Sequence, residues 1–95
     1  MFYLNVWLTV KVDDRVESVA NALVRTGAES KLEPGCERWE AYQSESDPKR
    51  FLLVERWTTK EHWEAHRNGK AVQEIYLKEV IPHVDREPYP SRLLI

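Results

Sequence analysis

Residues 2–12 read FYLNVWLTVKV and alternate between two kinds of side chain. Every even position is apolar: Phe2, Leu4, Val6, Leu8, Val10 and Val12. The odd positions carry Tyr3, Asn5, Trp7, Thr9 and Lys11. Because successive side chains of a strand point to opposite faces, the alternation predicts a β-strand whose even face lies in the core.

A helix and a hairpin are expected after this strand. Apolar residues recur at helical spacing over about 15–31, which predicts an amphipathic helix. The Pro and Gly of Glu33-Pro34-Gly35-Cys36 then break that helix. A second strand over 36–44 follows this break. Beyond a polar turn at 44–49, residues 51–58 alternate again, so we expect the two strands to form an antiparallel hairpin.

The last third of the chain is predicted to be mainly helical. Thr58 and Glu61 form a capping box that opens a short helix carrying Trp63 and His66. A further helix spans 70–81 and is ended by Pro82. Residues 92–95 could form a last short strand.

The order β, α, β, β, α, β is that of an α+β, ferredoxin-like split βαβ sandwich with an antiparallel sheet. No stretch rich in Gly, Ser or Pro divides the chain, so we expect a single domain over residues 1–95. Helices should cover one sheet face. The other face would expose Tyr3 and Trp7 beside Asn5, and such an apolar patch predicts a homodimer formed through this face.

Composition excludes several classes of function. The net charge is −2, with 14 basic and 16 acidic residues interspersed, so no basic stripe for nucleic acid is present. No run approaches the roughly 20 apolar residues of a membrane span, and the N-terminus lacks the features of a signal peptide. The single Cys36 predicts a reducing, cytoplasmic location.

A candidate site follows from spacing. Phe51, Leu53, Glu55 and Trp57 share one strand face, and a helix packed back across that face would place Trp63 and His66 over it. A carboxylate on an apolar face needs a hydrogen-bond donor, for which His66 or a backbone amide is available. In one interpretation Glu55 and His66 only connect the helix to the strand, and no reaction takes place. In the other, Glu55 orients His66 as a base beside an aromatic cleft.

Other motifs of enzymes are missing from the sequence. No phosphate-binding Gly-rich loop, Ser-His-Asp set or redox Cys pair is present, and neither His62 nor His83 with Asp85 has metal-ligand spacing. His62 is expected to be solvated. Any catalysis must therefore use few groups or a borrowed cofactor.

Three stretches together resemble the antibiotic biosynthesis monooxygenase family: Glu33-Pro34-Gly35-Cys36, residues 51–57 with sequence FLLVERW, and Glu64-Ala65-His66. The His follows the Trp by nine residues in the family pattern, as His66 follows Trp57 here. The resemblance implies a dimeric α/β barrel with a pocket between sheet and helices. It also implies oxidation of quinols or phenols by O₂ without metal, flavin or other cofactor.

On this resemblance, His66 is the base or proton relay, Glu55 orients it, and Trp57, Trp63, Phe51 and Leu53 contact a small aromatic substrate. Leu53 stands where some active members have Asn, and Ala71 stands where many have a second His. Asn5 could supply the missing polar group. Its odd position in the first strand, however, should turn its side chain toward the dimer face. Haem-degrading relatives need an axial His that the positions near Tyr76 do not offer.

Two other functions stay open. The first is a non-catalytic small-molecule binding or stress-related domain, which Leu53 and Ala71 favour. The second is an isomerase or lyase acting on a lactone or aromatic acid, with Arg38 or Arg67 binding the carboxylate. Fold alone does not decide between these functions.

Overall fold

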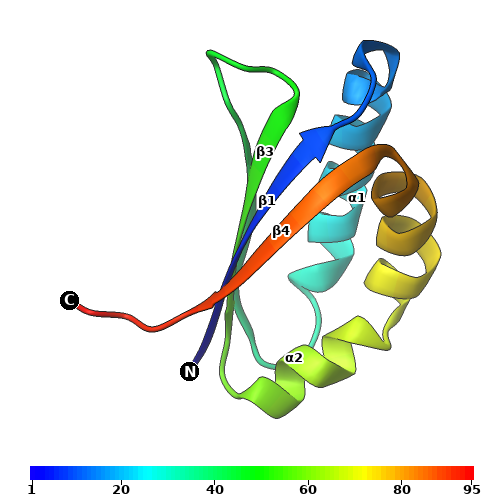
Figure 1. The fold of residues 1–95 in the computed structure, drawn as a ribbon. Helices are drawn as coiled ribbons and strands as arrows, with labels where there is room; N and C mark the ends of the chain where they lie inside the picture. The colour runs from blue at the N-terminus through cyan, green and yellow to red at the C-terminus, as the bar shows by residue number, and fades with distance from the viewer.

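The computed structural model describes all 95 residues and shows a four-stranded antiparallel sheet backed by helices (Figure 1). The strands are β1 (Phe2–Val10), β2 (Cys36–Gln43), β3 (Arg50–Trp57) and β4 (Val84–Ser91), in the spatial order β2-β3-β1-β4. The helices are η1 (Asp13–Arg15), α1 (Val16–Ser30), α2 (Lys60–Arg67), η2 (Ala71–Val80) and η3 (Ile81–His83). This arrangement confirms the ferredoxin-like α+β fold.

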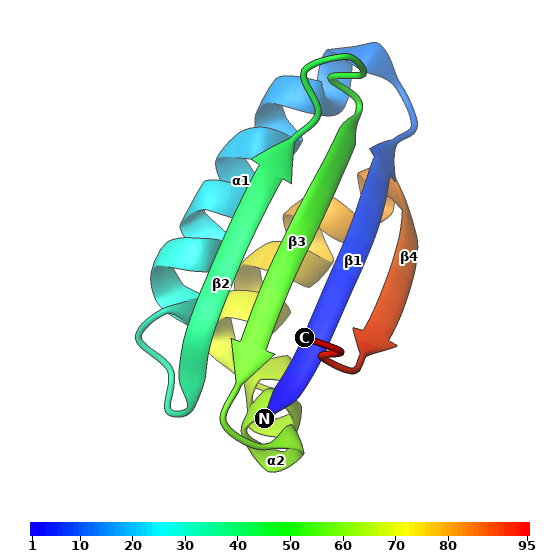
Figure 2. The ribbon, with the colours of Figure 1, turned by 90° about the vertical axis from the view of Figure 1, so that its left-hand side faces the viewer.

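All the helices lie on one side of the sheet, and the other face is bare (Figure 2). The alternation of β1 explains this division. Its even residues from Leu4 to Val10 are at most 1% exposed, whereas its odd residues from Tyr3 to Thr9 are only half-buried. Full burial of a Leu or Val side chain stabilises the folded state by roughly 1.5–3 kcal/mol. Burial of the even face therefore fixes the register of β1.

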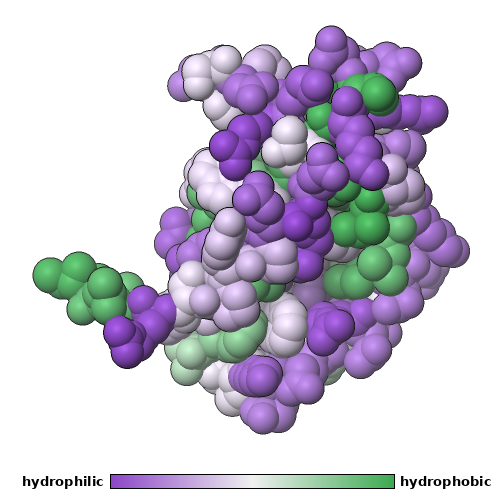
Figure 3. All heavy atoms as spheres, viewed as in Figure 1, coloured by the Kyte–Doolittle hydropathy of each residue, from purple (hydrophilic) through white to green (hydrophobic).

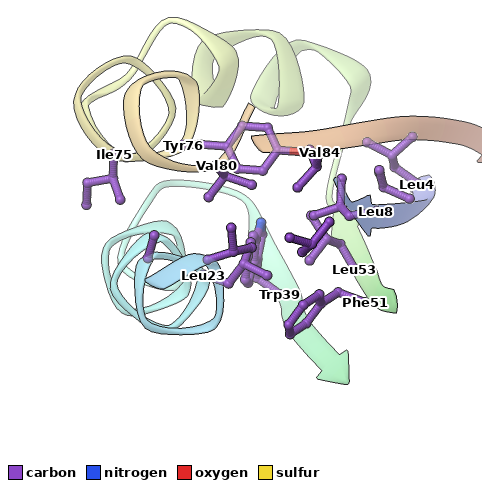
Figure 4. Packing of buried hydrophobic residues seen from close by; sticks show 14 of the residues in the cluster. Leu4, Leu8, Leu23, Trp39, Phe51, Leu53, Ile75, Tyr76, Val80 and Val84 are labelled. Atoms are coloured by element: carbon purple, nitrogen blue, oxygen red, sulfur yellow. The ribbon is translucent and has the colours of Figure 1, made fainter. Parts of the chain in front are cut away.

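The core lies between the sheet and two helices, α1 and η2. Val19, Ala22 and Leu23 of α1 and Ile75, Tyr76 and Val80 of η2 pack against the even face of β1 and the matching face of β3 (Figure 4). The predicted helix over 70–81 is present as η2, but its turns are of the wider π type. Such turns are frequent at functional sites.

The last strand does not lie at 92–95, where the sequence predicted it. It is β4, Val84–Ser91, which pairs with β1 from Val10↔Val84 to Tyr3↔Ser91. Only Val84 of this strand is buried, so β4 lacks the alternation by which strands are found. Pro88 and Pro90 also argue against a strand, but an edge strand tolerates proline because one side of its backbone has no partner.

The bare sheet face carries aromatic rings under arginines. The guanidinium of Arg50 lies 4.5 Å from the ring centre of Trp7, and that of Arg56 lies 5.2 Å from Tyr3. Beyond β4, the segment 92–95 extends away from the body on this side of the sheet, with hydrophobic side chains at its end (Figure 3). None of the helices has the length and apolar character of a membrane-spanning segment.

Candidate active site

A cavity of about 310 Å³ lies between the sheet and the helices. Its wall is built from seven elements: Thr26 of α1, Trp39 of β2, Glu55 of β3, Trp63, His66 and Arg67 of α2, Val72, Tyr76 and Leu77 of η2, Ile81 of η3, and Arg86 of β4. The wall is mostly apolar with a few polar groups, which is typical of small-molecule sites.

Glu55 is the buried acid of this wall. It follows Leu53 on the helix-facing side of β3 and is 5% exposed. Its Oε1 accepts a hydrogen bond of 3.1 Å from the indole Nε1 of Trp57. Burial raises the pKa of Glu55 above its ordinary value, although His66, the Trp57 hydrogen bond and Arg86 partly offset this effect.

His66 lies between two carboxylates. Its helix α2 begins at Thr59, whose side chain accepts from the backbone N–H of His62. Nδ1 of His66 is 2.5 Å from Oε1 of Glu33, whereas Nε2 is 3.7 Å from Oε1 of Glu55. The first distance is a short hydrogen bond and the second is too long for one. The proximity of Glu55 and His66 was predicted, but each has another hydrogen-bond partner.

Glu33 is a site residue that the sequence reasoning missed. In the sequence, Glu33 stands out only in the turn after the first helix and in the family motif. The 33 positions between Glu33 and His66 hide their contact. The loop is held firmly: Gly35 has φ +78, and a Cβ there would lie 2.2 Å from Cγ of His62. His62 is therefore half-buried against the loop and not solvated, and its Nδ1 is 2.9 Å from Oγ1 of Thr59.

A second polar pair, Arg86 and Tyr76, lines the same cavity. The guanidinium Nε of Arg86 donates a 3.1 Å hydrogen bond to the hydroxyl of Tyr76. Burial raises the pKa of Tyr76, and the positive charge of Arg86 opposes the rise. Arg67 lies over the ring of Trp63 at 5.0 Å. The cavity thus combines two arginines with Glu55 and His66.

The family model for antibiotic biosynthesis monooxygenase matches residues 1–76. The chain belongs to this family. A comparison with curated protein sequences gave no match.

Solved structures of similar chains share this fold. A "Putative antibiotic biosynthesis monooxygenase from Nitrosomonas europaea" is 27% identical, with complete coverage of both chains and a TM-score of 0.90. A possible oxidoreductase of unknown function from Bacteroides thetaiotaomicron is 21% identical over 97% of this chain and 96% of its own, with a TM-score of 0.89. SnoaB, a cofactor-independent oxygenase from Streptomyces nogalater, shares the fold at 12% identity, 99% and 93% coverage, and a TM-score of 0.85.

Three residues expected to contact substrate do not line the cavity of this antibiotic biosynthesis monooxygenase family member. Phe51 and Leu53 are buried in the core nearer the other end of β3. Trp57 is fully buried, and its ring centre lies 4.5 Å from that of His66. It therefore packs against His66 without lining the cavity. The shared strand face was predicted correctly, but only Glu55 on it lies where the helices leave a cavity.

Two further candidates lie on the opposite sheet face. Asn5 donates to Oγ of Ser91 and accepts from Arg56, so no bulge turns it toward the helices. Arg38 pairs with Glu40 at 2.9 Å and also lies away from the cavity. Of the two arginines considered for binding a carboxylate, only Arg67 lines the wall.

The arrangement is suited to proton transfer on an aromatic molecule. His66 has one ring nitrogen held by Glu33, and its other nitrogen lies on the Glu55 side at the cavity wall. A hydroxyl oxygen lying off the line between His66 Nε2 and Glu55 Oε1 would reach both atoms. Trp39, Trp63 and Tyr76 provide ring surfaces around it. No group of three His, Cys, Asp or Glu side chains is arranged as a metal site.

Proposed function

We propose that this chain is a cofactor-independent monooxygenase that oxidises a quinol or other hydroxylated aromatic molecule with O₂. The observation that carries the proposal is the position of His66, held by Glu33 on one nitrogen and lining a mostly apolar cavity beside Glu55. Family membership and the fold shared with a cofactor-independent oxygenase support it.

His66 would act as the base. Nε2 takes the proton of a substrate hydroxyl, and the carboxylate of Glu33 stabilises the imidazolium that results. The ionised, electron-rich ring then reduces O₂, and one oxygen atom bonds to a ring carbon. Loss of water from the resulting hydroperoxide leaves a carbonyl. One atom of O₂ enters the product and the other leaves as water.

The other residues of the cavity wall favour this chemistry through their apolar surface and through one polar pair. The apolar side chains of Val72, Leu77 and Ile81 limit the entry of water and suit both O₂ and an aromatic ring. Arg86 and Tyr76 add a positive charge and a hydroxyl to the same wall, and these groups would stabilise negative charge that develops on the substrate. The protein would thus supply a base, electrostatic stabilisation and a dry site, while the substrate supplies the electrons.

We further propose that two copies pair through the bare sheet face that carries Tyr3 and Trp7. Large rings in the middle of an otherwise uncovered sheet favour burial against a second copy. An isologous contact would bring the same face of each chain together and close a dimeric α/β barrel. The cytoplasmic location stays a prediction based on the single Cys36.

A non-catalytic binding domain is the second candidate. Leu53 and Ala71 are at most 1% exposed in the core, so neither position adds a polar group to the cavity. The cavity would then bind an aromatic molecule without reaction. This possibility shares every wall residue with the oxygenase and differs only in whether O₂ is consumed.

Oxygen uptake separates the two functions. Wild type would be given a panel of monocyclic and bicyclic quinols, alongside His66→Ala and the control His83→Ala, whose residue is outside the cavity. We expect uptake by wild type and the control, and a loss of roughly 10²-fold or more in kcat for His66→Ala. Absence of uptake with every quinol would refute the oxygenase proposal.

A further inference from the structure

The wall opposite the helices holds a second polar group, the indole N–H of Trp39. Trp39 pairs with Glu55 across β2 and β3, and both side chains face the helices. The Trp39 side chain is 3% exposed and lines the cavity. In Figure 4 it lies beside Leu23 of α1 and below the ring of Tyr76 of η2.

The nitrogen of this indole is buried and has no hydrogen-bond partner. Most buried donors in native proteins are paired, because an unpaired one loses its bond to water without replacement. The indole of Trp57, by contrast, donates to Glu55. An unpaired donor at a cavity wall therefore indicates an acceptor that arrives with a ligand.

The orientation of the ring points this N–H away from α1. A Cβ on Gly27 would lie 2.9 Å from Cε3 and 3.0 Å from Cζ3 of Trp39. Those carbons form the edge of the indole opposite its nitrogen. Because Gly27 lets that edge pack against α1, the nitrogen edge faces the side where Tyr76 and Glu55 line the cavity.

The neighbouring polar groups are already engaged with other partners. The hydroxyl of Thr26 donates to the carbonyl of Ala22 at 2.8 Å. The hydroxyl of Tyr76 accepts from Arg86, and Oε1 of Glu55 accepts from Trp57. None of them bonds to Trp39, so the wall itself does not satisfy the N–H.

We propose that Trp39 Nε1–H donates a hydrogen bond to a second oxygen atom of the substrate, distinct from the hydroxyl that faces His66 and Glu55. This inference rests on the proposed function only in taking the cavity as the substrate site. It restricts the substrate to ring systems with two oxygen atoms and makes Trp39 a residue that selects them over simple phenols. Such a selection works because binding a molecule without the acceptor leaves the donor unpaired.

Binding without turnover tests the inference. Under anaerobic conditions, naphthalene-1,4-diol and 1-naphthol differ by one oxygen and cannot be oxidised. Their affinities would be measured for wild type, for Trp39→Phe, and for Trp7→Phe, which makes the same change on the bare sheet face. We expect Trp39→Phe to weaken diol binding about three- to tenfold, the effect of one hydrogen bond, and to leave naphthol binding within about twofold. Trp7→Phe should change neither.

A second measurement avoids reliance on a core variant. In ¹H–¹⁵N spectra of the wild-type protein, the indole resonance of Trp39 should move downfield on addition of the diol and not of the naphthol. Equal weakening of both ligands by Trp39→Phe, an unmoved indole resonance, or failure of the diol to bind wild type would overturn the proposal. Diol binding through Trp39 without O₂ uptake in air would leave it standing and refute the oxygenase function alone.

Discussion

The carboxylate of Glu33 lies 2.5 Å from Nδ1 of His66, although one residue belongs to the loop after α1 and the other to α2. The His66 side chain is 5% exposed and that of Glu33 is 20% exposed, so the contact is shielded from water on the imidazole side. A carboxylate in this place holds the proton on Nδ1 and leaves Nε2 free to accept one from the cavity.

Replacement of Glu33 by Gln should lower kcat while changing KM little. The Gln carbonyl still accepts a hydrogen bond from Nδ1–H, but it carries no charge to stabilise the imidazolium. We expect a loss of roughly 10-fold or more in kcat, a part of the range for a general base. The exposed Glu61→Gln is the matched control. Unchanged kcat in Glu33→Gln would show that the carboxylate has no role beyond structure.

The same variant can be followed without substrate. Nitrogen-15 shifts of the His66 ring report which nitrogen carries the proton. We expect the Nδ1–H form in wild type and in Glu33→Gln, and a mixture of tautomers in Glu33→Ala, where no acceptor is left. Identical tautomer populations in all three proteins would contradict the positioning role of Glu33.

The stability contribution of Glu55 should depend on pH. Its pKa is raised, mainly by burial, so the native state holds its proton at pH values where the unfolded chain has lost it. The free energy of unfolding therefore falls as the pH rises from the ordinary pKa of Glu through the raised one. Glu55→Gln should remove this fall, and urea unfolding at several pH values between 4 and 8 would measure it. A constant stability difference across this range would contradict the prediction.

Substitution of Gly35 by Ala should destabilise the loop that carries Glu33. The residue needs φ +78, and a Cβ would overlap the ring of His62. The left-handed backbone costs about 1–2 kcal/mol for a residue with a side chain, and overpacking typically adds 1–3 kcal/mol. We expect a loss of at least about 2 kcal/mol in urea unfolding. In a His62→Ala background the loss should be smaller, because only the backbone term remains.

The proposed dimer predicts a mass of twice the 11.3 kDa chain in sedimentation equilibrium. Trp7→Glu should give monomers, because it puts a charge at the centre of the proposed contact and removes the ring beneath Arg50. Val24→Glu on the exposed side of α1 should not change the mass. A monomeric wild type at micromolar concentration would refute pairing through this face.

Local patterns in the sequence predicted most of the fold. The alternation in residues 2–12 predicted β1 and its buried face, and the helical period predicted α1 to within a residue or two at each end. The strand β4 was missed because an edge strand with one buried residue and two prolines has no alternation to detect. The spacing of Glu55 and His66 placed both at the candidate site, since strand parity and helix pitch are set by the backbone.

Tertiary structure alone decided which groups those two residues meet. Glu33 reaches His66, Trp57 binds Glu55, and the N–H of Trp39 remains unpaired at the cavity wall. Each of these contacts depends on how the loop and helices pack over the sheet, with Gly35 against His62 and Gly27 against Trp39. Side-chain periodicity is a property of one element, whereas such contacts depend on the packing of several elements that are far apart in the chain.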